Sequence, residues 1–253
     1  MKQARVISFG NHKGGVGKTT TTASVGSILA SKGYKVLVID LDAQANLTVS
    51  LLKEEPEDSI YFALTGRQKE LPIIPVTDNL SIVPSSLQLA MAEMELTAVI
   101  SREKILAELL EKVKGEYDFI LIDCPPSLGL LTLNAFTSST DIIIPLVSEV
   151  LPFKGLTMIN DFISQVQHRL NPQAHVTGIL ITRWESTRLT RDIEERLRKQ
   201  LSSLVFTTKI RKNITIAEAP LESKNIVEFD PKCNGAQDYR TFTDELLARY
   251  GLS

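Results

Sequence analysis

Apolar and polar positions follow two different periods along the chain, which predict short strands separated by helices. Apolar runs bounded by turn residues predict strands at Arg5–Phe9, Lys35–Asp40, Leu80–Val83, Tyr117–Asp123, Asp141–Val147, Val176–Thr182 and Ser203–Phe206. Spacing near the helical period predicts helices at Thr19–Ser31, Leu87–Val99, Arg102–Lys114, Leu130–Thr137, Gly155–Arg169, Thr187–Leu201 and Ala236–Tyr250. Runs such as Val36-Leu37-Val38-Ile39 are apolar throughout, which is typical of strands covered on both faces. The pattern predicts an α/β fold with a doubly wound, mostly parallel central sheet flanked by helices.

The 253 residues contain no internal repeat, low-complexity segment or linker, so we expect a single domain over residues 1–253. Hydrophobic residues make up 43% of the chain, which is enough for a full core. The net charge is −2, so binding to nucleic acid would need a local basic patch. The acidic run Glu54-Glu55-Pro56-Glu57-Asp58 is interpreted as a solvated loop.

The sequence shows no signal that would direct the chain out of the cytoplasm. We find no leader before the first predicted strand and no apolar run long enough to span a membrane. We also expect no helix-turn-helix domain before that strand. The two cysteines, Cys124 and Cys233, fit a reducing compartment. We therefore expect a cytoplasmic protein without a membrane segment.

A glycine-rich turn lies between the first predicted strand and the first predicted helix. It reads Lys13-Gly14-Gly15-Val16-Gly17-Lys18-Thr19-Thr20, and strand, turn and helix in this order are what a phosphate-binding loop requires. Its glycines let several backbone N–H groups point at one phosphate, and the helix N-terminus adds partial positive charge. We expect Lys18 to bind the β- and γ-phosphates and the Thr19 hydroxyl to ligate Mg²⁺. A tight turn without a ligand is the less favoured alternative.

The start of this loop departs from the usual motif. His12 stands where the common loop begins with glycine, and Lys13 adds a second lysine. Taken alone, Lys13 is an extra charge on a glycine turn.

Two of the predicted strands end in aspartate at the edge where open α/β sheets bind their ligands. The first leads into Asp40-Leu41-Asp42-Ala43-Gln44-Ala45-Asn46, and the second into Asp123-Cys124-Pro125-Pro126. Beside a phosphate loop, Asp42 is a candidate for holding the attacking water or hydrated Mg²⁺, and Asp123 for contacting Mg²⁺ as a Walker B acid. A turn with local side-chain bonds at Asp42, and a structural aspartate at the end of a buried strand, are the alternatives.

These three motifs together resemble the ParA/MinD group of P-loop ATPases, which carry a deviant Walker A loop with an extra lysine. The resemblance extends from about residue 4 to about residue 249. Its C-terminal part is similar to ParA-type, Soj-like partition proteins in four stretches, Ile210-Arg211-Lys212-Asn213, Ala217-Glu218-Ala219-Pro220, Phe229-Asp230-Pro231 and Gly235-Ala236.

The resemblance implies roles for individual residues. It places Lys13 where the family's signature lysine reaches across an ATP-dependent dimer to the partner's nucleotide. It makes Asp42 the residue that positions water, and Asn213 an adenine contact, while Arg211 stands where the family usually has proline. The implied catalytic residues are Lys13, Lys18 and Asp42. The implied ligands of Mg²⁺ are Thr19, Asp42 and Asp123, and the implied ATP-binding residues are Lys13, Gly14, Gly15, Val16, Gly17, Lys18, Thr19, Thr20, Arg211 and Asn213.

The resemblance further implies a switch that acts in plasmid, chromosome or mobile-element partition. ATP would close a homodimer, the dimer would bind nonspecific DNA on the nucleoid, and slow ATP hydrolysis stimulated by a ParB-like partner would release it. The candidate DNA-binding residues are Arg183, Arg188, Arg191, Lys209, Lys212 and Lys224. Because Asp192, Glu194 and Glu195 are interleaved with the arginines, a solvated amphipathic helix is the alternative.

Three other functions stay open at this point. A membrane-surface ATPase of the MinD kind would need a basic amphipathic C-terminal helix, and residues 244–253 are not basic. An iron–sulfur carrier of the same superfamily would need paired cysteines, and Cys124 and Cys233 lack the Cys-x-x-Cys spacing. A metabolic P-loop synthetase is also compatible with the motifs, although no residue identifies a substrate pocket.

Overall fold

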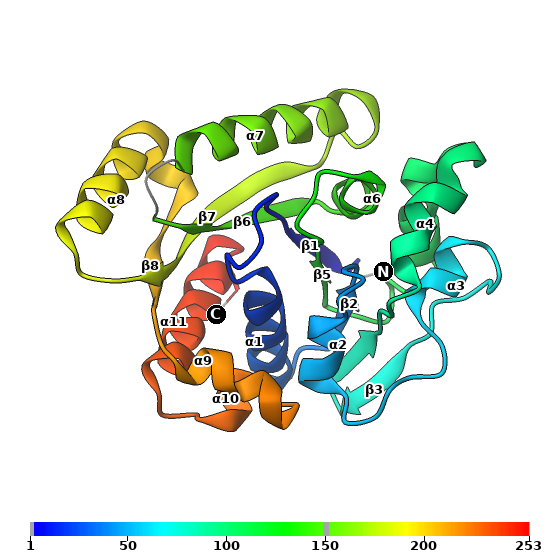
Figure 1. Cartoon of the computed structure of the whole chain (residues 1–253), viewed down its shortest axis with the longest axis horizontal. Helices are drawn as coiled ribbons and strands as arrows, with labels where there is room; N and C mark the ends of the chain where they lie inside the picture. Colours follow the sequence, from blue (N-terminus) through cyan, green and yellow to red (C-terminus); the bar gives the residue numbers. More distant parts are fainter. Residues whose placement is uncertain (1–2, 149–151, 253) are drawn as a thin grey trace.

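The computed structural model describes residues 3–148 and 152–252, and its centre is one eight-stranded sheet (Figure 1). The strand order is β3-β4-β2-β5-β1-β6-β7-β8, and all neighbours are parallel except β3 with β4. The strands are β1 (Arg5–Phe9), β2 (Val36–Asp40), β3 (Ile74–Thr77), β4 (Leu80–Val83), β5 (Phe119–Asp123), β6 (Asp141–Val147), β7 (His175–Trp184) and β8 (Val205–Arg211). The predicted doubly wound, mostly parallel sheet is confirmed.

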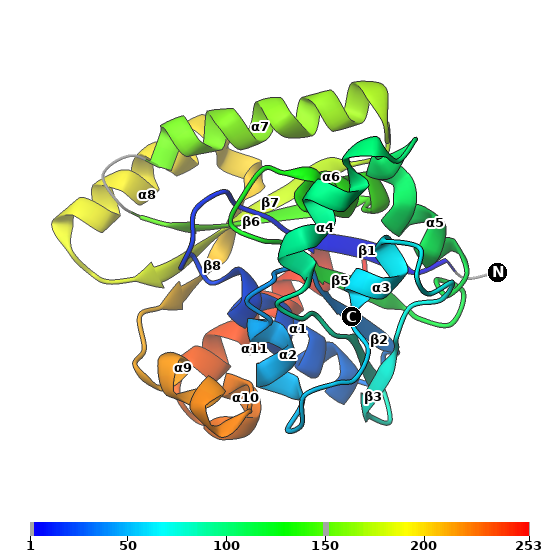
Figure 2. The same cartoon turned by 45° about the vertical axis from the view of Figure 1, so that its right-hand side comes forward.

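Helices cover both faces of this sheet (Figures 1 and 2). One face carries α3 (Ile60–Leu64), α4 (Leu89–Glu95), α5 (Ile105–Glu111), α6 (Leu130–Ser138), α7 (Pro152–Arg169) and α8 (Arg188–Leu201). The other carries α1 (Lys18–Ser31), α2 (Asn46–Leu51), α9 (Thr215–Glu218), α10 (Ile226–Phe229) and α11 (Asn234–Arg249). Four short 3₁₀ helices complete the described elements: η1 (Leu96–Ala98), η2 (Arg102–Lys104), η3 (Ser202–Leu204) and η4 (Ala219–Glu222).

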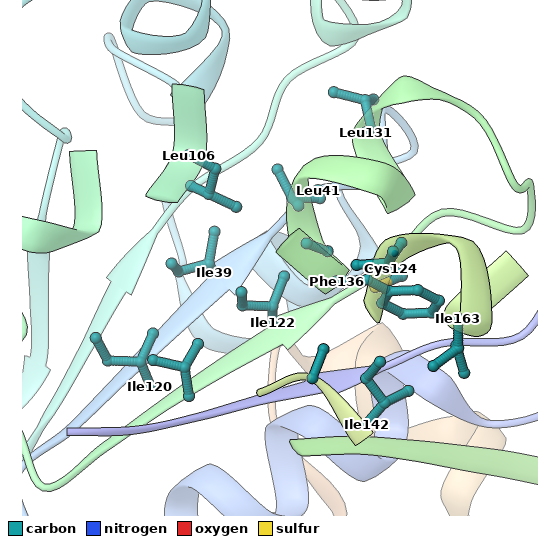
Figure 3. Close-up of a cluster of buried hydrophobic side chains, with 14 of the residues drawn as sticks. Ile39, Leu41, Leu106, Ile120, Ile122, Cys124, Leu131, Phe136, Ile142 and Ile163 are labelled. Carbon is teal, nitrogen blue, oxygen red and sulfur yellow. The ribbon is translucent and has the colours of Figure 1, made fainter. Parts of the chain in front are cut away.

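Side chains of the central strands alternate between two cores, one on each face of the sheet. In β5, Ile120 and Ile122 belong to the core under α3–α8, while Phe119 and Leu121 belong to the core under α1 and α11. Figure 3 shows the first core, in which Ile120 and Ile122 lie in the same cluster as Phe136 of α6. Because both faces are buried, the strands are apolar at successive positions and not only at alternate ones.

Several boundaries differ from the prediction. The stretch Ser202–Leu204 is a 3₁₀ helix, and the last strand runs from Val205 to Arg211 instead of over Ser203–Phe206. Within the described sheet, this edge strand pairs with β7 alone, and an edge strand can carry polar residues. Because polar residues follow Phe206, a search for apolar runs does not detect the rest of the strand. The predicted helix at Leu87–Val99 is the shorter α4 followed by η1, and the predicted helix at Arg102–Lys114 is η2 followed by α5. The elements β3, α2, α3, α9 and α10 are too short for periodicity to predict.

Candidate nucleotide and magnesium site

The glycine-rich loop connects the carboxyl end of β1 to the first residue of α1. Gly15 and Gly17 have φ values of +70° and +86°, a left-handed conformation that only glycine adopts without strain. Asn11 holds the start of the loop, since its Nδ2 donates to the Pro145 carbonyl (2.7 Å) and its Oδ1 accepts from the Lys13 N–H (3.1 Å). Sequence reasoning missed Asn11, because its partner Pro145 is 134 positions away.

Lys18 points into the loop and is only 6% exposed. Its Nζ donates to the Lys13 carbonyl oxygen at 3.0 Å. A phosphate oxygen bound in the loop could accept from the same ammonium group. Burial lowers the pKa of the Lys18 amine, and the acidic groups of Asp123, Cys124 and Asp42 act in the opposite direction. The loop therefore contains one buried amine next to two carboxylates.

The two strand-terminal aspartates lie side by side, because Asp40 of β2 and Asp123 of β5 are register partners. Both oxygens of Asp40 accept hydrogen bonds, from the Asp42 N–H (3.1 Å) and from the N–H and Oγ1–H of Thr48 (2.9 and 2.8 Å). Burial raises the pKa of Asp40 to about 6, although these bonds oppose the shift. Asp40 thus positions the loop that carries Asp42, a role that sequence reasoning did not assign.

Asp123 is fully buried, and within residues 3–148 and 152–252 neither of its carboxylate oxygens has a hydrogen-bond partner. Burial and the adjacent Asp40 raise the pKa of Asp123 well above its usual value, while the nearby Thr19 hydroxyl and Lys18 act to lower it. A buried carboxylate without a partner is costly unless a cation or proton satisfies it. The residues present therefore fit Mg²⁺, with Thr19 and Asp123 on its protein side.

A cavity of about 770 Å³ lies along the N-terminal half of α1 and reaches the segment between β8 and α10. The residues predicted to bind nucleotide or Mg²⁺ that line it are Gly14, Gly15, Gly17, Lys18, Thr19, Thr20, Asp42, Arg211 and Asn213. Val16 instead packs inward, where its carbonyl oxygen accepts from the Thr182 hydroxyl at 2.8 Å. The structure therefore brings the phosphate loop, one acid and the two predicted adenine-side residues to a single cavity.

An ion pair fixes the wall of the cavity that carries Arg211 and Asn213, the two predicted adenine-side residues. The Arg211 guanidinium donates to both carboxylate oxygens of Asp238 on α11, with an Nη2–Oδ1 distance of 2.7 Å. The Arg211 backbone N–H also donates to Asp238 (2.9 Å), and Asn213 Oδ1 accepts from the Thr215 N–H (3.0 Å). Arg211 is thus held in place by Asp238, which sequence reasoning did not single out.

Lys13 belongs to the phosphate loop but does not line the cavity. Its backbone is engaged at both ends, through its N–H to Asn11 and its carbonyl to Lys18. Its side-chain amine makes no hydrogen bond or ion pair within the described residues. The amine is therefore available to a group outside the cavity of its own chain.

Two of the six candidate DNA-binding residues form ion pairs with acids among the described residues. Lys209 pairs with Glu194 at 3.0 Å, and its Nζ lies 4.2 Å from the ring centroid of Trp184. Lys212 pairs with Glu185 at 2.5 Å. These internal pairs reduce the charge that either lysine offers to a phosphate backbone.

The other four candidates lie in two places. Arg183 has a φ of +50°, lines the cavity and directs Nη1 at the Gly15 carbonyl (3.5 Å), and Lys224 lines the cavity as well. Arg188 and Arg191 are exposed in the first turn of α8. Arg183, Lys212 and Lys224 are exposed as well, but within the described residues only Arg188 and Arg191 of this set neither line the cavity nor pair with an acid.

The raised pKa values of Asp40 and Asp123 make the nucleotide-free chain sensitive to pH. Because the folded state holds these protons more tightly, the contribution of these two carboxyl groups to stability is greatest at low pH and is lost as the pH rises, for Asp40 from 3.8 through about 6. At pH 8 we expect Asp123→Asn to raise the melting temperature of the nucleotide-free protein by about 2–4 °C, the shift that about 1 kcal/mol produces at this chain length. Thermal unfolding monitored by circular dichroism at several pH values measures it.

The matched control for this prediction is Asp78→Asn, which alters an exposed acid. It should leave both the melting temperature and its pH dependence unchanged. An Asp123→Asn protein that melts at or below the wild-type temperature at pH 8 would show that the buried carboxylate carries no unpaired charge.

Comparison with known proteins places this geometry in a family. A family model described as an AAA domain (AAA_31) matches residues 4–176. The sporulation initiation inhibitor protein Soj of Bacillus subtilis is 39% identical over 249 residues, which are 96% of this chain and 98% of Soj. The chromosome-partitioning ATPase Soj of Treponema pallidum is 36% identical and covers 98% of both chains. The chain belongs to the Soj/ParA family of P-loop ATPases.

A solved structure shares the complete fold of this Soj/ParA chain. It is cobyrinic acid a,c-diamide synthase from Mycobacterium smegmatis, determined with a bound ATP analogue and magnesium. The two are 34% identical with a TM-score of 0.85, over 98% of this chain and 96% of the other. The same sheet and helices therefore occur in a protein that holds a nucleotide and magnesium.

The structure also locates the features relevant to the alternative functions. Cys124 is buried beside Asp123, whereas the Sγ of Cys233 accepts from the Ala236 N–H (3.3 Å) at the start of α11. Within residues 3–148 and 152–252, no helix is long and apolar enough to cross a membrane.

Proposed function

We propose that this Soj/ParA chain is a Mg²⁺- and ATP-dependent ATPase switch that closes as a homodimer around its nucleotides. The observation that carries the proposal is Lys13, which belongs to the phosphate loop yet does not line the cavity, and whose amine has no partner among the described residues. A lysine in this position can neutralise phosphoryl charge only in a site outside its own cavity. A second copy of the chain supplies such a site.

Within one subunit, the described residues divide the work on ATP. The loop N–H groups and Lys18 would bind the phosphates, Thr19 and Asp123 would hold Mg²⁺, and Asn213 would lie on the adenine side. Asp42 is partly exposed on the cavity wall, held by Asp40, where it can orient water or hydrated Mg²⁺. Bound Mg²⁺ supplies charge neutralisation on the β- and γ-phosphates.

The proposal includes nonspecific DNA binding in the ATP state and a role in plasmid, chromosome or mobile-element partition. Its support is the chromosome-partitioning relative and the outward-facing arginines of α8. A ParB-like protein would stimulate hydrolysis, and the single-domain protein would reside in the cytoplasm and gather on the nucleoid. The cobyrinic acid a,c-diamide synthase at 34% identity supports the second candidate, a metabolic synthetase that activates a carboxylate with ATP.

Binding to plasmid DNA with and without ATP tests the proposal. We expect Asp42→Ala, which keeps ATP but loses hydrolysis, to bind DNA with an affinity that falls steeply with salt. Arg188→Ala/Arg191→Ala should lower the slope of log affinity against log salt by about 1 for each phosphate-binding arginine removed, whereas the exposed Arg196→Ala on the same helix should not.

Two outcomes would contradict the partition function. One is an Asp42→Ala protein that binds ATP but shows no salt-sensitive affinity for DNA. The other is ATP turnover that depends on a carboxylate substrate and an amide nitrogen donor, which would establish the synthetase.

A further inference from the structure

The helix α4 carries an apolar face that the nucleotide site does not use. Leu87, in the turn directly before α4, and Met91 and Met94 of α4 follow the i, i+4, i+7 spacing of one helix face and are 75%, 45% and 75% exposed. Val99 and Ile100, directly after η1, are 42% and 92% exposed. We call these five residues the α4 face. It lies on the outside of the molecule beside α3 (Figures 1 and 2).

Acidic residues adjoin one end of the α4 face. Glu54, Glu55, Glu57 and Asp58 are exposed, and none of them forms an ion pair within the described residues. This acidic segment ends at Ser59. The Ser59 and Ser86 hydroxyl oxygens lie 2.8 Å apart, and the next residue, Ile60, donates its N–H to the Pro84 carbonyl (2.8 Å). The acidic segment therefore meets the chain immediately before Leu87, the first residue of the α4 face.

The α4 face is also connected to both acid-bearing loops of the nucleotide site. The Ser85 N–H donates to the Thr48 hydroxyl oxygen (2.9 Å), and that hydroxyl donates to Asp40. On α4 itself, the Glu93 carboxylate accepts from the Leu131 N–H (3.2 Å) at the start of α6, the helix that follows the Asp123 loop. A change in the position of α4 can thus reach Asp42 through Asp40, and Asp123 through α6.

We propose that the α4 face is the docking site for a basic amphipathic helix of a partner protein. The five exposed apolar side chains would cover the apolar stripe of such a helix, and methionine adapts its shape to different partners. The adjoining acidic segment selects basic flanking residues by charge complementarity. The effect of docking on hydrolysis rests on the ATPase function proposed above, whereas docking itself does not.

The test uses a defined probe, a fluorescein-labelled peptide of leucine and lysine about 18 residues long with leucine at helical spacing. Anisotropy is measured without nucleotide or DNA, so the result is independent of ATPase activity. We expect binding in about 0.1 M salt that weakens severalfold in about 0.5 M salt. Leu87→Ser/Met94→Ser should weaken binding at least tenfold, and Glu55→Gln/Glu57→Gln/Asp58→Asn should weaken it and reduce the salt dependence. Met158→Ser, which alters an exposed methionine on α7, is the matched control and should bind normally.

Two binding results would overturn the docking site: equal binding of the same peptide with glutamate in place of lysine, or unchanged binding by Leu87→Ser/Met94→Ser. A third result would assign the face to a second copy of the chain. In that case the wild type self-associates without binding the peptide, and Leu87→Ser/Met94→Ser loses the self-association. Bound peptide should also change the ATP turnover of the wild type at least threefold and leave that of Leu87→Ser/Met94→Ser unchanged. Binding without a change in turnover would retain the docking site and refute its connection to the acids. Absence of all turnover would instead count against the ATPase proposal.

Discussion

Lys18→Ala should lower the affinity for ATP at least about 100-fold, because a charged hydrogen-bond donor to a phosphate in a desolvated site contributes up to about 3 kcal/mol. Lys18 is the one lysine that the described phosphate loop directs inward, 6% exposed and bonded to the Lys13 carbonyl. The loop glycines cannot compensate, since their N–H groups supply partial charges only. Isothermal titration with ATP and Mg²⁺ measures the loss, and hydrolysis should fall with it.

The matched control is Lys35→Ala, which removes an exposed lysine immediately before strand β2. It should bind ATP as the wild type does. Thermal unfolding separates loss of binding from loss of fold. Removing a buried amine also removes its desolvation cost, so we expect the melting temperature of Lys18→Ala to change by no more than about 3 °C. A correctly folded Lys18→Ala protein with wild-type ATP affinity would refute the assignment of the phosphate site.

Local sequence signals were sufficient for the central strands of the sheet and for the phosphate loop. The central strand runs are apolar at successive positions because both faces are covered, and Gly15 and Gly17 occupy left-handed conformations that leave few other residue types possible. The edge strand β8 was misplaced because exposure on one side makes Thr207 and Thr208 acceptable within it. The prediction of strands and turns therefore succeeded where burial or backbone conformation allows few residue types, and it failed where many residue types are acceptable.

The residues that hold the site in shape could not be predicted in this way. Asn11 bonds to Pro145 across 134 positions, and Arg211 is fixed by Asp238 across 27. Asp40 was visible as part of an acidic loop, but only its contacts to Thr48 distinguish this buried, positioning aspartate from the partly exposed Asp42. Such pairs depend on tertiary contacts, which one sequence without relatives does not reveal.

The position of Lys13 leads to the second large effect. Because Lys13 does not line the cavity of its own chain, Lys13→Ala should keep ATP affinity within about threefold of wild type. Hydrolysis should fall by at least about 10³-fold if the amine acts on the partner's phosphates as an arginine finger does. Single-turnover hydrolysis and ATP titration on the same preparation measure the two quantities separately.

Mixing Lys13→Ala with Asp42→Ala decides whether the lysine acts between subunits. In a mixed dimer, the site that keeps Asp42 receives Lys13 from the other chain, so one of its two sites is complete. Random pairing of equal amounts should therefore restore up to about one quarter of the wild-type rate, although each variant alone is inactive. Lys13→Ala mixed with Lys13→Ala/Asp42→Ala is the control and should remain inactive, because neither chain supplies the amine. If the first mixture stays inactive while both variants bind ATP and pair, Lys13 acts within its own subunit, and the shared-nucleotide dimer loses its main support.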